Sequence, residues 1–290
     1  MSNSALRLLT ALIGIPTIVG MLYLGDWPFT LLVLVLALLA QLEVYQLLEA
    51  AGQRPNRVLG LLLGALLVLR AVHPPLLFAA AAVTVAVVAW SPLQQRSAGS
   101  LPPGDAAEAP IGASSAGAAM LPATLFGAVY PSSLLAFLLD LRAARGPGVA
   151  DLDAFFLTLA VFVLVWSADT AAYYVGRSLG KRPLAPAASP KKTWEGAIGG
   201  VVGALAAAIA LKLLVLDVLP WLHAGAIGLI AGILGPLGDL AESTMKRHVG
   251  VKESGSLLPG HGGMLDRFDA MTLVAPAAYL YLRFVAGIFP

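Results

Sequence analysis

The stretch PFTLLVLVLALLAQLEVYQLL, residues 28–48, decides the class of this protein. Its apolar residues are continuous rather than alternating, and its length suffices for a helix that crosses a bilayer core of roughly 30 Å. Similar runs recur along the 290-residue chain, which is 59% hydrophobic and 12% charged, whereas a soluble domain carries about 25% charged residues. Backbone polar groups in lipid must be satisfied within each segment. The sequence therefore predicts an all-α polytopic integral membrane protein.

About nine segments are candidate transmembrane helices. They cover residues 8–24, 28–48, 58–72, 75–90, 122–141, 154–175, 196–216, 223–240 and 270–288. Residues 91–120 are rich in Ser, Gly, Pro and Ala, which predicts a flexible loop. We therefore divide the chain into residues 1–120, which hold the first four helices and this loop, and residues 121–290, which hold five helices and the chemically informative loops. The first segment has no clear cleavage site and is followed at once by another, so we expect a retained helix rather than a signal peptide.

The placement of charge predicts the orientation. With the N-terminus in the cytoplasm, most of the 18 lysines and arginines fall on the cytoplasmic side, as the positive-inside rule requires. Arg142 and Arg145 fall on the opposite side, against the rule. The absence of cysteine excludes disulfides, thiolate nucleophiles and Cys-based metal sites. We expect both polar stretches described below to face the cytoplasm.

The sixth segment ends in WSADTAAYYVGR, residues 166–177. Asp169, Tyr173 and Arg177 are spaced i, i+4 and i+8, so they share one helix face. A carboxylate within a span is costly and usually faces a polar cavity, which favours a functional role for Asp169. The alternative is an interfacial acid that pairs locally with Arg177.

The loop that follows contains SPKKTWEG, residues 189–196. Ser189, Lys191, Lys192, Thr193 and Glu195 bring hydroxyl and charged groups together just before a new helix. Helix N-termini favour anions, and lysines neutralise phosphate charge, so this loop is a candidate phosphate site. The alternative is an ordinary positive-inside loop in which Ser189 or Thr193 caps the helix.

The end of the eighth segment carries acids on one helix face. Asp239, Glu242 and Lys246 are spaced i, i+3 and i+7, and Gly235 and Gly238 would permit close approach of another helix. Asp266 precedes the last segment, so we expect it to lie at the same membrane depth as Asp239. Two such carboxylates would repel unless a cation lay between them, and Mg²⁺ commonly uses one or two carboxylates plus substrate phosphates. Sodium or proton coupling in a transporter is the rival explanation.

Between these acids runs STMKRHVGVKESGSLLPGHGGMLDRFD, residues 243–269. It concentrates charge and glycine between two apolar segments. His261 lies among glycines and could donate to a phosphate or transfer a proton, although a lone histidine is often structural.

These stretches together resemble the signature of phosphatidate cytidylyltransferases (CDP-diacylglycerol synthases). The resemblance covers roughly residues 165–290 with named motifs, and the first half agrees in hydropathy alone. Glu253 stands where that family usually has Asp, which puts a role for Glu253 in direct metal binding in doubt. The resemblance implies an inner-membrane enzyme that joins CTP to phosphatidic acid, giving CDP-diacylglycerol and pyrophosphate. It implies Mg²⁺ held by Asp239 and Asp266, a monovalent cation such as K⁺ as a further aid, and a homodimer. Membrane lipids are expected partners and nucleic acids are not.

By this resemblance and the spacing above, we assign the expected roles. The catalytic residues are expected to be Asp239, Lys246, Arg247, Lys252, His261 and Asp266. The substrate-binding residues are expected to be Asp169, Tyr173, Arg177, Ser189, Lys191, Lys192, Thr193, Glu195, Ser243, Arg267 and Asp269. The alternatives are another CTP-dependent membrane lipid enzyme, such as a polyprenol or phytol kinase or a CDP-archaeol synthase, or a cation-coupled transporter.

Overall fold

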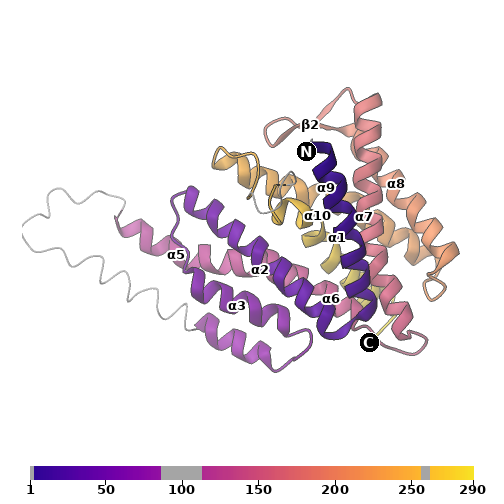
Figure 1. Ribbon diagram of the computed structural model, residues 1–290, viewed down its shortest axis with the longest axis horizontal. Coiled ribbons are helices and arrows are strands. Elements are labelled where there is room, and N and C mark those ends of the chain that lie inside the picture. Colours follow the sequence, from indigo (N-terminus) through magenta and orange to yellow (C-terminus); the bar gives the residue numbers. More distant parts are fainter. Residues whose placement is uncertain (1–2, 86–112, 256–261) are drawn as a thin grey trace, which may run out of the picture.

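A computed structural model describes residues 3–85, 113–255 and 262–290. The chain forms a bundle of helices with one small hairpin, and its N-terminal and C-terminal halves lie side by side (Figure 1). In chain order the elements are α1 Asn3–Leu24, α2 Asp26–Ala50, α3 Arg57–Leu69, an unlabelled helix Leu76–Val85, α5 Ala113–Gly127, the π-helix η1 Ala128–Ser133, α6 Phe137–Arg142, α7 Asp151–Leu179, β1 Pro183–Ala185, β2 Ser189–Thr193, α8 Trp194–Leu214, α9 Trp221–His248, α10 Leu265–Leu280 and the π-helix η2 Tyr281–Val285.

The all-α polytopic class is confirmed. Among the described residues, six helical segments are long and apolar enough to cross a membrane: Asp26–Ala50, Met120–Arg142, Asp151–Leu179, Trp194–Leu214, Trp221–His248 and Leu265–Val285. Shorter apolar helices cover Thr10–Leu24, Arg57–Leu69 and Leu76–Val85. A helix therefore stands at each of the nine expected positions, and the crossing of the membrane by all nine stays a prediction.

Part of the expected flexible loop is helical in the structure. Helix α5 begins at Ala113, inside the stretch 91–120 that was expected to be a flexible loop, because its alanines favour helix. Residues 91–112 lie outside the described part of the chain. The proline-rich loop after α7 forms an antiparallel pair of short strands, β1 and β2, in which Pro183 lies opposite Thr193.

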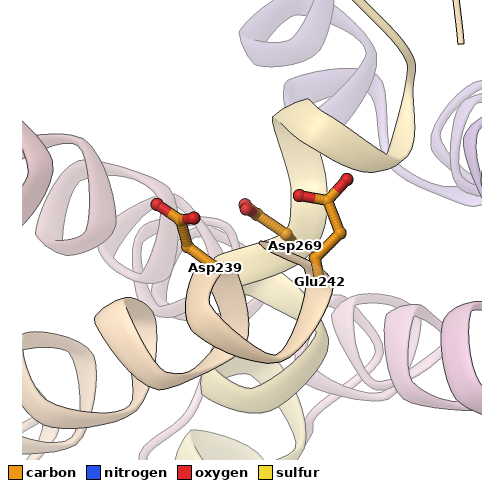
Figure 2. Close-up of side chains that lie close together, drawn as sticks. All are labelled: Asp239, Glu242 and Asp269. Carbon is orange, nitrogen blue, oxygen red and sulfur yellow. The ribbon is translucent and has the colours of Figure 1, made fainter. Parts of the chain in front are cut away.

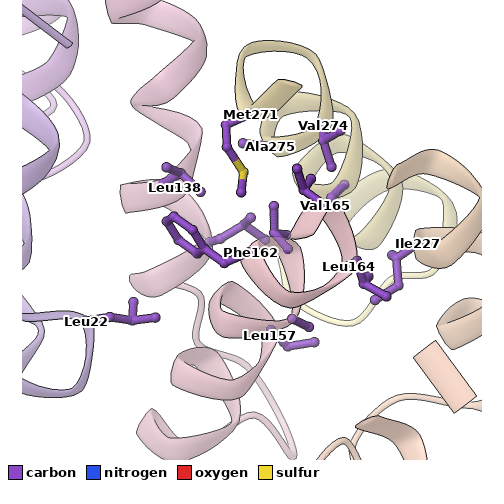
Figure 3. Close-up of a cluster of buried hydrophobic side chains, with 14 of the residues drawn as sticks. Leu22, Leu138, Leu157, Phe162, Leu164, Val165, Ile227, Met271, Val274 and Ala275 are labelled. Atoms are coloured by element: carbon purple, nitrogen blue, oxygen red, sulfur yellow. The ribbon is translucent and has the colours of Figure 1, made fainter. Parts of the chain in front are cut away.

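The hydrophobic core is centred on α7. Its buried face presents Leu157, Phe162, Leu164 and Val165 toward residues of α1, α6, α9 and α10 (Figure 3). The partners drawn there are Leu22, Leu138, Ile227, Met271, Val274 and Ala275. Because α7 and α10 pack together, the polar ends of α7, α9 and α10 are brought close in space.

Small residues allow α8 to lie closely between α7 and α9. A Cβ added at Gly200 would lie 3.1 Å from the Ala168 oxygen on α7, and one at Gly232 would lie 2.8 Å from the Val201 Cα on α8. Apolar burial gives little drive for helix association in lipid, so such close van der Waals packing takes its place. The order of helices around the site thus depends on glycine and alanine at these crossings.

Arg142, which the expected orientation places on the outer side against the positive-inside rule, pairs with a carboxylate of the protein itself. Its side chain is buried and donates to Asp151 at 2.7 and 3.1 Å and to the Leu22 carbonyl at 2.9 Å. Gly25, at φ +66°, brings the backbone so close that a Cβ would lie 2.6 Å from the Arg142 guanidinium. The exception to the rule is therefore a structural ion pair that ties α1, α6 and α7 together.

Replacing Gly232 by valine is expected to destabilise the bundle by about 1–3 kcal/mol, because the new side chain would overlap the backbone at Val201. The matched control is Gly225→Val on the same helix, where an added Cβ meets nothing within 4 Å. Thermal unfolding of the detergent-solubilised variants measures the effect. Equal midpoints for the two variants would contradict the close packing of α8 on α9.

Candidate functional site

Three acids meet where α9 crosses α10. Asp239 and Glu242 come from α9 and Asp269 comes from α10, and one oxygen of each lies within 4.8 Å of the others. Figure 2 shows the three carboxylates on the same side of the crossing. The two helices can approach because residue 238 is glycine: a Cβ there would lie 3.1 Å from the Ala270 Cα. The prediction that Gly238 permits a close approach is confirmed.

This acid cluster, Asp239, Glu242 and Asp269, has the donors that a hard divalent cation takes. Carboxylate oxygens are the ligands that Mg²⁺ uses in proteins. Within the described residues, Glu242 Oε1 is buried and has no hydrogen-bond partner, which is costly for a carboxylate oxygen. The side chains of Glu242 and Asp269 are buried, so their charges must be compensated locally. Two observations therefore suit the cluster to a cation: its carboxylate oxygens are suitable ligands, and Glu242 Oε1 has no other partner.

Two lysines meet these acids. Lys246, buried on α9, lies 2.7 Å from Glu242 Oε2 and also pairs with Asp266. Lys192, on β2, lies 2.6 Å from Asp239 Oδ2 and is partly exposed. Because Lys246 already bonds two carboxylates, Lys192 is the better placed of the two to exchange its partner for a phosphate.

Asp266 has a different environment from the three acids of the cluster. Its Oδ2 accepts hydrogen bonds from the backbone of Gly263 at 2.8 Å and of Ser254 at 3.1 Å, and its Oδ1 pairs with Lys246. These bonds close the loop between α9 and α10 onto the start of α10. Metal binding by Asp239 and Asp266 together stays a prediction, and the geometry groups Asp239 with Glu242 and Asp269 instead.

Helix α7 supplies the third side of the site. The charges of Asp239 and Lys192 act on Asp169, and α7 contacts α9, so the part of α7 around Asp169 lies beside the acid cluster. Arg177 donates to the Tyr173 hydroxyl at 3.0 Å, as their spacing on one face predicts.

The hairpin after α7 holds Lys192 in place. Thr193 is the N-cap of α8 and accepts from Gly196 N at 3.1 Å, which confirms the capping interpretation for this residue. Glu195 accepts from the backbone N–H groups of Lys181 at 3.0 Å and Arg182 at 3.2 Å. Both side chains therefore stabilise the hairpin whose second strand, β2, carries Lys192, and Ser189 begins that strand.

Of the remaining expected residues, Ser243 contacts the acid cluster directly. Ser243 is buried and donates to Asp239 Oδ1 at 3.2 Å. Four positively charged residues of the same polar stretches are exposed: Lys191, Arg247, Lys252 and Arg267. Glu253 is exposed as well, and His261 lies outside the described residues.

Glu43, on α2, also belongs to this region, although it is not among the residues expected at the site. Its carboxylate is buried and accepts from the backbone of Met264 and Leu265, each at 2.8 Å, and from the Ser254 hydroxyl at 2.8 Å. The sequence does carry a signal for this residue. An acid within an apolar helix costs free energy unless it has a polar partner, so Glu43 could have been predicted to face one.

Known proteins match this chain along most of its length. The sequence profile described as the cytidylyltransferase family matches residues 5–285. The phosphatidate cytidylyltransferase of Synechocystis sp. is 34% identical in an alignment 294 positions long that covers 95% of each chain.

Other relatives match over shorter stretches. The phosphatidate cytidylyltransferase of Bacillus subtilis is 47% identical over 136 residues, covering 46% of this chain and 51% of the relative. That of Brucella suis is 52% identical over 122 residues, covering 42% of this chain and 44% of the relative. The chain spans about half the length of these two relatives in those matches. With the profile match over residues 5–285 and the full-length similarity to the Synechocystis protein, the chain belongs to the cytidylyltransferase family.

Proposed function

We propose that this protein transfers a cytidylyl group from CTP to phosphatidic acid, giving CDP-diacylglycerol and pyrophosphate. The observation that carries the proposal is the acid cluster beside Lys192 and Lys246, at the ends of apolar helices. Such a site offers oxygen ligands for a cation and positive charge for phosphates, next to a lipid-facing bundle. The names of the relatives support the same substrates.

We propose that Mg²⁺ binds at Asp239, Glu242 and Asp269. The supporting observations are the closeness of their three oxygens and the unpaired Glu242 Oε1. When bound there, the ion would neutralise phosphate charge and favour the departure of pyrophosphate. The monovalent cation stays an expectation from the resemblance.

Phosphatidate carries an oxyanion at neutral pH, so the reaction needs no strong general base. Its phosphate oxygen attacks the α-phosphorus of CTP, a new O–P bond forms, and the bond from that phosphorus to the bridging oxygen breaks as pyrophosphate leaves. The difficulty is to bring two anions together in line, which calls for positioning and charge neutralisation.

The residues of this chain divide that work. Lys192 would leave Asp239 for a phosphate oxygen, because its side chain is partly exposed at the edge of the cluster. Lys246 keeps Glu242 and Asp266 in place and contributes positive potential from its buried position. The exposed lysines and arginines of the polar stretches would attract both substrates from solution.

The site is proposed to face the cytoplasm of the inner membrane, where CTP is available. The positive-inside bias and the bacterial relatives support this placement. Phosphatidic acid would keep its acyl chains in the bilayer and bring its headgroup to the helix ends. A homodimer is part of the same proposal, and the mass of the purified protein in detergent would test it.

The test is turnover by the purified full-length chain with CTP, Mg²⁺ and phosphatidate. We expect CDP-lipid and pyrophosphate in equal amounts. A polyprenol or phytol kinase would instead release CDP and phosphorylate an alcohol, and a CDP-archaeol synthase would prefer an ether lipid in a substrate panel. Cation flux in proteoliposomes without nucleotide consumption would support a transporter and overturn the proposal.

Asp269→Asn is expected to lower the rate of CDP-diacylglycerol formation by at least ~100-fold, because a lost cation ligand removes several kcal/mol of stabilisation. Mg²⁺ should also raise the unfolding temperature of the wild type and not that of the variant. The control is Asp217→Asn in the exposed turn between α8 and α9. Normal turnover and an intact Mg²⁺ response in Asp269→Asn would remove Asp269 from the metal site.

Lys192→Gln is expected to lower kcat/KM for CTP by about 10- to 100-fold, because a charge-assisted hydrogen bond contributes ~1.5–3 kcal/mol. The control is Lys181→Gln, an exposed lysine at the start of the same hairpin loop, with an expected change below about 2-fold. Steady-state kinetics at varied CTP separates the two. Similar losses of kcat/KM in both variants would mean that CTP use depends on overall positive charge and not on the position of Lys192.

A further inference from the structure

Glu43 is a buried acid that the proposed chemistry does not use. It sits on α2, in the N-terminal half, and is 3% exposed. Among the described residues no lysine or arginine forms an ion pair with it. Its charge is met instead by the N–H groups of Met264 and Leu265 at the start of α10 and by the Ser254 hydroxyl. Backbone donors at a helix N-terminus are well suited to hold an anion.

The loop is shaped around this carboxylate. A Cβ at Gly255 would lie 2.6 Å from Glu43 Oε1, and one at Gly263 would overlap Glu43 Oε2 and Ser254 Oγ. The absence of side chains at these two positions thus lets the backbone of Gly255 and Gly263 lie against Glu43. The packing is specific to a carboxylate that reaches from another helix.

Ser254 links Glu43 to the candidate active site. Its Oγ lies 2.8 Å from Glu43 Oε2 and 3.1 Å from Asp266 Oδ2, so its one hydroxyl proton is shared between the two acids. Asp266 in turn pairs with Lys246, which bonds Glu242 of the acid cluster. A chain of direct contacts therefore runs from α2 to the proposed metal ligands.

We propose that Glu43 is a positioning residue for catalysis: it fixes the start of α10 and Ser254, and through them Asp266 and Lys246. The expected effect of Glu43 on catalysis rests on the proposed function, whereas its anchoring of the start of α10 rests on geometry alone. Glutamine at this position keeps the size but can accept at one atom, so at least one N–H group or the Ser254 hydroxyl loses its acceptor. The N-terminal half of the chain thus completes the site without contacting substrate.

The experiment compares Glu43→Gln with Gln41→Met, a matched substitution two residues away on α2. Gln41 is also buried, but it donates to the Gly60 carbonyl at 2.7 Å and the Tyr45 hydroxyl at 2.9 Å and accepts from the Ser132 hydroxyl at 2.8 Å, all away from the start of α10. Both variants disturb a buried polar group of the same helix. Hydrogen exchange of peptides covering residues 262–268 reports the anchoring, and steady-state kinetics reports the catalysis.

For Glu43→Gln we expect faster exchange at Met264 and Leu265 and a fall in kcat of about 10- to 100-fold, with KM for both substrates within about 3-fold. For Gln41→Met we expect a lower unfolding temperature with kcat and the exchange of residues 262–268 unchanged. In the double variant Glu43→Gln/Ser254→Ala, kcat should fall by less than the product of the two single-variant factors, because both substitutions remove the same Glu43–Ser254 contact.

The outcomes separate the two proposals. An inactive wild type that still shows the exchange difference would overturn the proposed function and leave the anchoring intact. An active wild type with normal kcat in Glu43→Gln would overturn the positioning role. Equal losses in Glu43→Gln and Gln41→Met, in proportion to their unfolding temperatures, would reduce Glu43 to a packing residue.

Discussion

The buried ammonium of Lys246 is the interaction on which the site depends. It lies between Glu242 on the same helix and Asp266 on the next, so one cation offsets two acids inside an apolar bundle. Removing one partner from such a group leaves uncompensated buried charge, which costs roughly 3–5 kcal/mol. The same contact joins α9 to α10 where Gly238 lets them approach. The packing of these two helices and the placement of the acids therefore have one cause.

The sequence predicts what local rules control. Apolar runs place a helix at each expected position, because a backbone in lipid must form its own hydrogen bonds. Helical spacing correctly puts Glu242 and Lys246 on one face, and the capping preference of threonine correctly starts α8 at Thr193. Each of these rests on residues within a few positions of one another.

Those local rules do not predict which residues of different helices meet. The last helix was expected to begin at residue 270 but begins at Leu265, so Asp269 lies inside α10 opposite Gly238, about one turn deeper than Asp266. Asp239 and Asp266 were expected at equal depth because the last helix was expected to start at residue 270. Apolar composition alone places that start too far along the chain, since residues 265–269 are polar or charged in part but helical. Glu43 meets Met264 across more than 200 residues of chain, a pairing that no periodicity encodes.

The charge at the cluster constrains how ligands can bind. Asp239, Glu242 and Asp269 repel one another, and together with Asp169 they would repel a triphosphate. Lys192 offsets one of these charges while it remains on Asp239. A divalent cation at the cluster would reverse the local sign, freeing Lys192 for phosphate and lowering the electrostatic cost of CTP binding. Cation and nucleotide should therefore strengthen each other's binding by the same factor, because linkage between two sites is reciprocal.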